Sequence, residues 1–439
     1  MAPPVEVAPP VEAQPPARRI LIASMVGTTI EFFDFYIYAM AAVLVFPTLF
    51  FPKQDPATAT LQSLATFALA FIARPIGSAL FGHFGDRIGR KATLVTALLT
   101  MGVSTVLIGL LPTYATIGVL APALLALCRF GQGLGLGGEW GGAVLLATEN
   151  APPGKLAWYG SFPQLGAPLG FLCSSGAYLW ISTHLTRGQL LDWGWRLPFL
   201  ASTVLVAVGL YVRLQLIETP EFQRVLAQGE QVRVPFMTVI TRHTRALVLG
   251  TLGTITTFLA FYLMTVFALT WATDSLKFAH GDYLILQMFA VTFFGLTIPI
   301  SAALADRIGG RAMLMIATLA ILAFGFTFEP LFGAHDRMKV CAFLVLGFTL
   351  IGFTYGPLSS VLASLFPVHV RYTGSSLTFN LAGILGASLA PYVAKRLADN
   401  YGVGTVGIYL SASCVVTAIA LAMMGGSAGR GTEPAGELR

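Results

Sequence analysis

Twelve long apolar runs constrain the fold of this 439-residue chain more than any other feature of its sequence. A helix needs about 20 mostly apolar residues to cross a bilayer, and runs of this size form two sets of six on either side of the polar segment 218–245. The sequence therefore predicts an all-α membrane protein with 12 transmembrane helices in two six-helix bundles. The runs lie near residues 20–48, 58–81, 92–112, 117–146, 157–183, 195–217, 246–273, 282–305, 311–332, 339–366, 373–396 and 402–425.

The composition agrees with a membrane protein. Apolar residues make up 56% of the chain and charged residues 10%, and the mean hydropathy is +0.76, whereas soluble domains contain roughly a quarter charged residues. The net charge of +6 does not indicate nucleic-acid binding, because the basic residues are spread over short loops. The four cysteines lie inside apolar runs without the spacing of metal ligands, so we expect them to pack in the core.

Polar segments at the ends and in the middle of the chain define its expected domains. Residues 1–19 are rich in Pro and Ala, and we predict that they form a disordered cytoplasmic tail. Bundles at 20–217 and 246–425 flank a cytoplasmic linker at 218–245, and a short cytoplasmic tail follows at 426–439. Sixteen of the 26 Lys and Arg residues fall on the side of the amino terminus and eight on the opposite side, which favours two cytoplasmic termini.

The residues Asp-Arg-Ile-Gly occur twice, at 86–89 and 306–309, each time between two apolar runs and about half a chain apart. Such a repeat indicates an internal duplication, which is the usual construction of secondary transporters. Glycines allow a sharp turn between helices, and the charged side chains can make and break contacts with neighbouring helix ends. We therefore expect two pseudo-symmetric bundles and assign a gating role to Asp86, Arg87, Arg90, Lys91, Asp306, Arg307 and Arg311.

Two carboxylates, Glu31 and Asp34, lie in the first apolar run. Ionisable groups are costly inside a membrane, so each is a candidate for function. Their spacing places both on one face of a helix, where burial and mutual repulsion favour proton binding. One of them can therefore carry a proton across the membrane. A salt bridge that only holds helices together is the alternative, and the sequence does not choose between the two carboxylates.

The fourth run carries Arg129, which is followed by glycines at positions 133, 137 and 141 that let a second helix pack closely. Arg129 and Glu139 lie roughly 15 Å apart along this helix, too far to pair with each other. Because a buried charge is costly without a partner, we expect pairing with other helices, and Glu31 or Asp34 are natural partners. The guanidinium of Arg129 also suits a substrate carboxylate, and a purely structural ion pair is the alternative.

Further polar residues inside the runs are candidates for substrate contact. Arg74 precedes Pro75, so it can face a cavity or bond a carbonyl group that the proline leaves free. For the amide side chains the alternative is ordinary hydrogen bonding between helices, and for the aromatic ones it is core packing. The remaining candidates are Glu139, Gln132, Tyr38, Gln164 and Asn380.

The sequence carries no enzyme signature. It lacks a nucleophile elbow, a zinc-binding pair of histidines on a helix and a P-loop. Glycines at positions 133, 135 and 138 match a dinucleotide-binding spacing, but they lie inside an apolar run without a preceding soluble strand. We therefore expect no enzyme activity, no cofactor and no metal site.

Several motifs resemble those of a transporter family. The loop Gly82-x-x-x-Asp86-Arg87-x-Gly89-Arg90-Lys91 matches the cytoplasmic signature of the major facilitator superfamily. Within it, the chain is similar to the metabolite:proton symporters, which carry organic acids or osmolytes such as α-ketoglutarate, citrate, shikimate, proline and betaine. The other matching motifs are Glu31-x-x-Asp34-Phe35-x-x-Tyr38, Arg74-Pro75-x-Gly77, the glycine series from Gln132 to Gly142, Glu218-Thr219-Pro220-Glu221-Phe222 and Arg371-Tyr372-Thr373-Gly374.

The resemblance implies a proton-coupled symporter that imports a small organic acid across the inner membrane by alternating access. The substrate would be a mono-, di- or tricarboxylate or a shikimate-like molecule. The expected partners are this substrate, H⁺ and the lipid bilayer, without nucleic acid, and we expect a monomer. Osmolyte uptake is the alternative, although the long coiled-coil tail of many osmolyte carriers is missing. Gly166-Ala167-Pro168-x-Gly170 matches an exporter signature only in part, so drug efflux is a lesser alternative.

Overall fold

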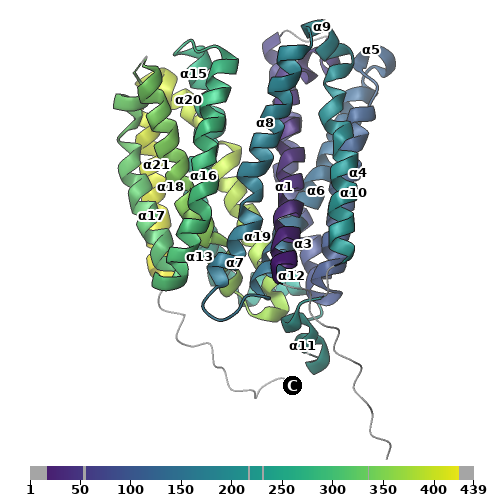
Figure 1. Ribbon diagram of the computed structural model, residues 1–439, viewed down its shortest axis with the longest axis vertical. Helices are drawn as coiled ribbons and strands as arrows, with labels where there is room; N and C mark the ends of the chain where they lie inside the picture. The colour runs from purple at the N-terminus through teal and green to yellow at the C-terminus, as the bar shows by residue number, and fades with distance from the viewer. Residues whose placement is uncertain (1–16, 53–55, 216–217, 230–231, 335, 425–439) are drawn as a thin grey trace, which may run out of the picture.

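The computed structural model describes residues 17–52, 56–215, 218–229, 232–334 and 336–424, and most of these are helical. Two groups of helices stand side by side, and the short helices of a linker lie at one end (Figure 1). The first group consists of α1 (Ala17–Leu44), α2 (Phe46–Phe50), α3 (Pro56–Arg87), α4 (Arg90–Leu110), α5 (Tyr114–Ile117), α6 (Leu120–Thr148), α7 (Leu156–Gln164), α8 (Gly166–His184), α9 (Arg187–Gln189), η1 (Leu190–Gly194) and α10 (Arg196–Leu214).

The linker and the second group follow in chain order. The linker contains α11 (Pro220–Gln228) and α12 (Pro235–Arg242). The second group consists of α13 (Thr244–Leu252), α14 (Ile255–Tyr262), η2 (Leu263–Phe267), α15 (Ala268–Asp274), α16 (His280–Ile308), α17 (Gly310–Gly325), η3 (Phe328–Phe332), α18 (Arg337–Ser364), η4 (Val368–Val370), α19 (Arg371–Gly383), η5 (Ile384–Ser388), α20 (Ala390–Tyr401) and α21 (Gly404–Met423).

Ten helical stretches of the described chain are long and apolar enough to cross a membrane. Backbone polar groups find no water inside a bilayer, so a spanning segment bonds them within a helix. Two further spans complete the set: α17, which has 16 residues, and the pair of α7 and α8, which is interrupted at Leu165. The result is the twelve-helix fold that the sequence predicts.

The interruption between α7 and α8 follows from two prolines. Pro163 and Pro168 have no backbone N–H, so the helix loses hydrogen bonds on both sides of Leu165. The hydroxyl of Thr28 on α1 donates to the carbonyl oxygen of Pro163 at 2.7 Å. Gly166 leaves the room that Thr28 occupies, so α1 packs closely along this broken span.

We call the end of the molecule at which α11 and α12 lie the linker end, and the end that carries α5, α9 and α15 the far end (Figure 1). The two groups meet mainly along two helices. Helix α19 of the second group packs on α3 and α6, and α7 of the first group packs on α16 and α18. Both α7 and α19 begin near the linker end, so the chain joins its halves there.

The glycine ladder of α6 packs as the sequence predicts. A Cβ atom on Gly133 would lie 2.7 Å from backbone atoms of Ala70 on α3, and one on Gly137 would overlap the carbonyl oxygen of Arg74. A Cβ atom on Gly141 would instead overlap the hydroxyl of a serine on α19. The ladder therefore seats α6 against helices of both groups.

The repeated turn ends on glycine for a geometric reason. Gly89, between α3 and α4, has a φ angle of +126°, and Gly309, between α16 and α17, has a φ angle of +95°. Residues with a Cβ atom rarely adopt such angles. Each copy of the Asp-Arg-Ile-Gly sequence therefore reverses the chain at its glycine and leaves its aspartate on the last turn of a helix.

The structure differs from the expected segments at three places. Helix α1 begins at Ala17, so residues 17–19 are helical, whereas residues 1–16 and the carboxyl-terminal segment 425–439 lie outside the described residues. The linker is more than a polar connection, because it contains α11 and α12. Helix α13 begins at Thr244, which is two residues inside the expected linker.

We predict that Gly137→Ala destabilises the fold, whereas the matched change Gly176→Ala in α8 is neutral or stabilising. Alanine is the better helix former by about 1 kcal/mol, but at position 137 its methyl group meets the backbone of α3, and such overpacking costs about 1–3 kcal/mol. At position 176 the nearest atom lies 4.0 Å away. Melting temperatures of the purified protein in one detergent measure both effects, and equal values for the two variants would contradict this prediction.

Candidate functional site

A small cavity of about 20 Å³ lies between the two groups of helices. Helices α1, α3 and α6 of the first group and α14, α18 and α19 of the second group supply its walls. Most of the lining is aromatic. The charged and polar side chains that face it are Glu31, Tyr36, Arg74, Tyr262, Tyr355 and Asn380.

Glu31 and Arg74 bring opposite charges to this cavity. Both are buried, with 3% and 8% of their surface exposed, yet they form no ion pair with each other within 4.0 Å. The Oε2 atom of Glu31 and the Nε atom of Arg74 have no hydrogen-bond partner among the described residues. The guanidinium of Arg74 lies over the rings of Phe35 and Phe71, with its Cζ atom 4.6 and 5.1 Å from their centroids. The cavity is thus lined by a carboxylate and a guanidinium that form no ion pair with each other and each keep one polar atom without a partner among the described residues.

Asp34 does not line the cavity, although it shares α1 with Glu31. The hydroxyl of Ser202 on α10 donates to Oδ1 of Asp34 at 2.5 Å. This contact lies inside the first helix group. The spacing that puts two carboxylates on one helix therefore directs them to different neighbours.

Arg129 lies in an aromatic box and not beside a carboxylate, so its expected pairing with Glu31 or Asp34 is wrong. Its Cζ atom lies 4.0 Å from the ring centroid of Tyr38, 4.7 Å from that of Phe67 and 5.0 Å from that of Phe35. Cation–π contacts of this kind are worth about 2 kcal/mol when desolvated, which offsets part of the cost of burial. Nη1 also donates to Oε1 of Gln132 at 3.0 Å.

Two other predicted residues, Gln132 and Tyr38, lie beside Arg129 inside the first group. Gln132 donates to the hydroxyl of Thr105 at 2.7 Å, and the hydroxyl of Tyr38 lies 2.7 Å from that of Thr66. Neither Gln132 nor Tyr38 lines the cavity. Both hold the surroundings of Arg129 in place.

Glu139 pairs with Arg213, which lies near the end of the sixth apolar run and is not among the predicted candidates. Arg213 is 2% exposed in the last turn of α10, forms an ion pair with Glu139 on α6, and donates to the carbonyl oxygen of Leu94 on α4 at 2.8 Å. This pair ties three helices of the first group together. Glu139 is therefore a structural residue in this arrangement.

A layer of contacts between the halves lies next to the cavity. The rings of Trp140 on α6 and Phe379 on α19 stack with centroids 3.7 Å apart. Trp140 donates to Oε1 of Gln164, and Nε2 of Gln164 donates to the carbonyl oxygen of Tyr355 on α18 at 3.1 Å. Asn380 on α19 donates to the hydroxyl of Ser78 on α3 at 2.7 Å. Gln164 and Asn380 thus join the halves, and of the two only Asn380 lines the cavity.

The carboxylate of Asp86 binds the first turn of α19 from the opposite half. Oδ1 accepts from the backbone N–H of Tyr372 at 3.1 Å, and Oδ2 accepts from the N–H and the hydroxyl of Thr373 at 2.9 and 2.8 Å. The first N–H groups of a helix have no partner within it, and its dipole favours a negative charge there. The side chain of Asp86 therefore caps a helix across the interface.

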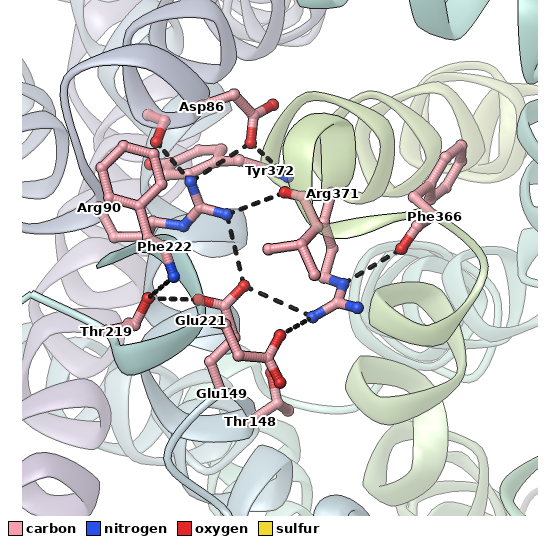
Figure 2. Close-up of polar contacts among 12 residues, drawn as sticks. Asp86, Arg90, Thr148, Glu149, Thr219, Glu221, Phe222, Phe366, Arg371 and Tyr372 are labelled. Carbon is pink, nitrogen blue, oxygen red and sulfur yellow. Dashed lines mark hydrogen bonds and ion pairs between the residues drawn. The ribbon is translucent and has the colours of Figure 1, made fainter. Parts of the chain in front are cut away.

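A network of charged side chains surrounds this cap (Figure 2). The guanidinium of Arg90 is fully buried and lies 3.5 Å from Asp86 and 3.4 Å from Glu149, and it donates to the carbonyl oxygen of Val368 in the second half at 3.2 Å. Arg371 lies 3.6 Å from Glu149.

The linker joins the same network. Arg371 also lies 2.5 Å from Glu221 on α11, and the hydroxyl of Thr219 donates to Glu149 at 2.6 Å. The ring of Phe222 covers the guanidinium of Arg90 at 4.5 Å. Three sequence motifs from the first half, the linker and the second half therefore form one cluster.

Asp306 repeats the cap of Asp86 with the halves exchanged. Its Oδ1 and Oδ2 atoms accept from the backbone N–H groups of Ala157 at 2.7 Å and Trp158 at 2.9 Å, in the first turn of α7. Each half therefore supplies one aspartate that caps a helix of the other half.

The remaining residues with a predicted gating role lie around these two caps. Arg87, Arg307 and Arg311 are exposed, whereas the backbone N–H of Lys91 donates to Glu218 of the linker at 3.2 Å.

Sequence reasoning missed several residues of the site. Tyr262 and Tyr355 line the cavity, but a tyrosine in an aromatic-rich span is not distinctive. Glu149 lies just beyond the fourth run, where an acidic residue looks like an ordinary loop residue, so the sequence does not single it out. Glu221 and Arg371 belong to motifs identified in the sequence, but the spacing of these motifs does not show that the two side chains form an ion pair.

Two helix groups enclose a buried, mainly aromatic cavity and contact each other at the linker end, an arrangement typical of membrane transport proteins. Residues 24–391 match the Major Facilitator Superfamily, and the chain belongs to this superfamily. It is a multi-pass membrane transporter of metabolites and not an enzyme.

Named relatives cover nearly the whole chain. The inner membrane metabolite transport protein YhjE of Escherichia coli (strain K12) is 58% identical over 408 residues, which cover 92% of this chain and 93% of the relative. The shikimate transporter of the same strain is 36% identical over 416 residues, or 93% and 94%. The proline/betaine transporter of Salmonella typhimurium (strain LT2) is 33% identical over 395 residues, or 87% and 78%.

A solved structure of the proton:xylose symporter XylE, bound to 6-bromo-6-deoxy-D-glucose, has the same fold. It superposes with a TM-score of 0.74 at 17% identity and covers 94% of this chain and 95% of that one. At this identity the likeness extends to the fold alone.

We predict that Asp86→Asn loosens the first turn of α19. A hydrogen bond to a charged group contributes about 1.5–3 kcal/mol, so losing the charge should speed hydrogen exchange at Tyr372 and Thr373 by roughly tenfold or more. Exchange followed by mass spectrometry on the full-length protein measures this. Asp336→Asn removes the charge of a cap at the far end, on the N–H of Met338, and serves as control. Equal exchange at 372–373 in the wild type and Asp86→Asn would contradict the prediction.

Proposed function

We propose that this protein is a proton-coupled symporter that imports a small organic acid across the bacterial inner membrane by alternating access. The observation that carries the proposal is that Glu31 and Arg74 line the same cavity between the halves without an ion pair between them. In this closed arrangement the cavity of about 20 Å³ holds no more than about one water molecule. In this proposal it widens when the halves separate, and the proton carrier and the anion-binding group then face the same substrate. The relatives named as a shikimate transporter and a metabolite transport protein support a small metabolite as the substrate.

Glu31 is the better candidate for the proton site. It lines the cavity and keeps one carboxylate oxygen without a hydrogen-bond partner among the described residues. Asp34 also keeps one oxygen, Oδ2, without a partner among these residues, but it does not line the cavity, and its Oδ1 atom accepts a short hydrogen bond from Ser202 within the first half. A proton on Asp34 therefore has no direct contact with the substrate space.

Arg74 is the better candidate for the anion contact. Its guanidinium lines the cavity, and a planar fork of N–H donors matches a carboxylate. Arg129 does not line the cavity and lies behind Phe35, whose ring contacts both guanidinium groups. In this proposal Arg129 maintains the positive potential and the packing behind the site.

Alternating access would operate at the linker end. The two caps on α19 and α7 hold the halves together there, and opening this end requires both aspartates to release their N–H donors. The charged network around Arg90 would exchange its contacts with the second half for water.

A cytoplasmic linker end and two cytoplasmic termini agree with the excess of basic residues on that side. The relative named as an inner membrane protein supports that membrane. A monomer is sufficient in this proposal, because one chain lines the whole cavity.

Uptake of a zwitterionic osmolyte is the second candidate. Glu31 and Arg74 together offer one charge of each sign, and aromatic rings surround them, which suits a quaternary amine with a carboxylate. The relative named as a proline/betaine transporter supports this alternative. A thermal-shift panel of carboxylates, amino acids and betaines distinguishes the two, since a ligand raises the stability of the folded protein that binds it.

We predict that Glu31→Gln abolishes accumulation driven by a pH gradient and retains exchange of labelled ligand across the membrane. Glutamine keeps the shape of the side chain but cannot release a proton. Uptake into proteoliposomes with an alkaline interior measures accumulation, and counterflow at equal pH measures exchange. Asp34→Asn is the matched control and is expected to accumulate substrate; loss of accumulation in Asp34→Asn with full accumulation in Glu31→Gln would reverse the assignment.

We also predict that Arg74→Lys weakens the apparent affinity for a carboxylate substrate by roughly tenfold to a hundredfold, because lysine replaces a two-pronged contact by a point charge. Arg129→Lys, which keeps the charge behind the cavity, is expected to have the smaller effect. Concentration dependence of uptake at fixed pH gives both values. A larger loss in Arg129→Lys than in Arg74→Lys would show that the anion contact is Arg129.

A further inference from the structure

A groove of about 910 Å³ opens at the linker end and shares no lining residue with the central cavity. Both halves form its walls. The start of α7, with Leu156 and Ala157, supplies one wall, and the ends of α16, α18 and α21 together with the starts of α13 and α17 supply the others. The proposed transport cycle makes no use of this groove.

Three arginines give the groove an excess of positive charge. Arg242, Arg245 and Arg311 line it, and none of them has an ion-pair partner among the described residues. Arg245 donates one hydrogen bond to the carbonyl oxygen of Met423 at 3.2 Å. The carboxylate of the groove, Asp306, is already bonded to two N–H groups of α7. An anion would therefore meet three guanidinium groups that can bind it.

The groove also offers an apolar surface beside these charges. Leu249, Met315 and Leu365 line it. Ile308 and Met423 line it too, with 50% and 54% of their surface exposed. A ligand that only carried charge would leave this surface uncovered, whereas a ligand with a hydrocarbon chain would cover it.

The groove lies at the depth where the membrane spans end. Candidate spans end at Ile308, Ser364 and Met423, and another begins at Thr244, all of them in the groove or next to a residue that lines it. Phospholipid headgroups lie at this depth, and arginines there attract anionic lipids.

We propose that this groove binds one anionic phospholipid of the bilayer, with its phosphate on Arg242, Arg245 and Arg311 and part of an acyl chain on the apolar residues. Because the start of α7 forms one wall, the groove has this shape only while the halves are joined at the linker end. The bound lipid therefore stabilises the arrangement in which both aspartate caps are made.

Retention of phosphatidylglycerol by the full-length protein tests the site. The protein is reconstituted in nanodiscs of phosphatidylcholine with phosphatidylglycerol, released into mild detergent, and its bound lipids are counted by native mass spectrometry. The variant R242Q/R245Q/R311Q is expected to lose one phosphatidylglycerol, with an affinity lowered by roughly a hundredfold. The matched control R224Q/R233Q/R307Q removes three exposed arginines that do not line the groove.

Loss of the lipid in the groove variant alone supports the proposal. Equal loss in both variants, or equal retention in both, overturns it. Stabilisation of the wild type by soluble glycerol phosphate to the same extent as by phosphatidylglycerol would identify a site for free anions and would also overturn the lipid assignment. If the triple variant does not fold, Arg311→Gln alone, compared with Arg307→Gln, gives the same test with a smaller decrease.

A separate measurement tests whether the bound lipid stabilises the closed linker end. Spin labels at Lys155→Cys in the first half and Arg307→Cys in the second, in a variant without the native cysteines, report the separation at the linker end; neither residue lines the groove. Phosphatidylglycerol is expected to increase the fraction at the short distance. A distance distribution that is the same with and without this lipid overturns the claim that the lipid stabilises the closed linker end.

Discussion

The structure depends on one interaction used twice: a carboxylate of one half binds the N–H groups at the start of a helix of the other half. Asp86 accepts three hydrogen bonds from the first turn of α19, and Asp306 accepts two from the first turn of α7. A helix start supplies donors and a favourable dipole without a second charged side chain. The charge of the carboxylate makes this contact strong. Water can replace the N–H donors when the halves separate, so the contact can also be broken.

Buried charge is distributed unequally between the halves. The buried charged side chains of the described residues all lie between Glu31 and Arg213, in the first half. The second half contributes tyrosines, an asparagine and backbone groups to the cavity and the interface. The two halves therefore share the arrangement of helices and the aspartate caps, whereas the buried charged side chains of the described residues lie in the first half alone. A moving part that carries few buried charges of its own leaves few of them unpaired when it separates from its partner.

The twelve spans, the duplication and the glycine ladder could be predicted from the sequence because each depends on local spacing. Contacts between distant segments could not be predicted in the same way. The cost of a buried charge predicts a carboxylate partner for Arg129, but three aromatic rings and Gln132 surround it instead.

The motifs at Glu221 and Arg371 are recognisable as patterns in the sequence. Only the folded chain shows that Arg371 contacts both Glu221 and Glu149, and that Glu149 also contacts Arg90. The partner of a buried charge depends on three-dimensional packing, and one sequence does not contain that information in its spacing.

The smallness of the central cavity has a consequence for the energy balance of a cell. A volume of about 20 Å³ accommodates roughly one water molecule, so the closed cavity has no room for a file of water molecules. Protons hop readily along such files. If this cavity is the transport site, the closed arrangement gives protons no water-filled route past it, and an idle protein does not discharge the voltage across its membrane.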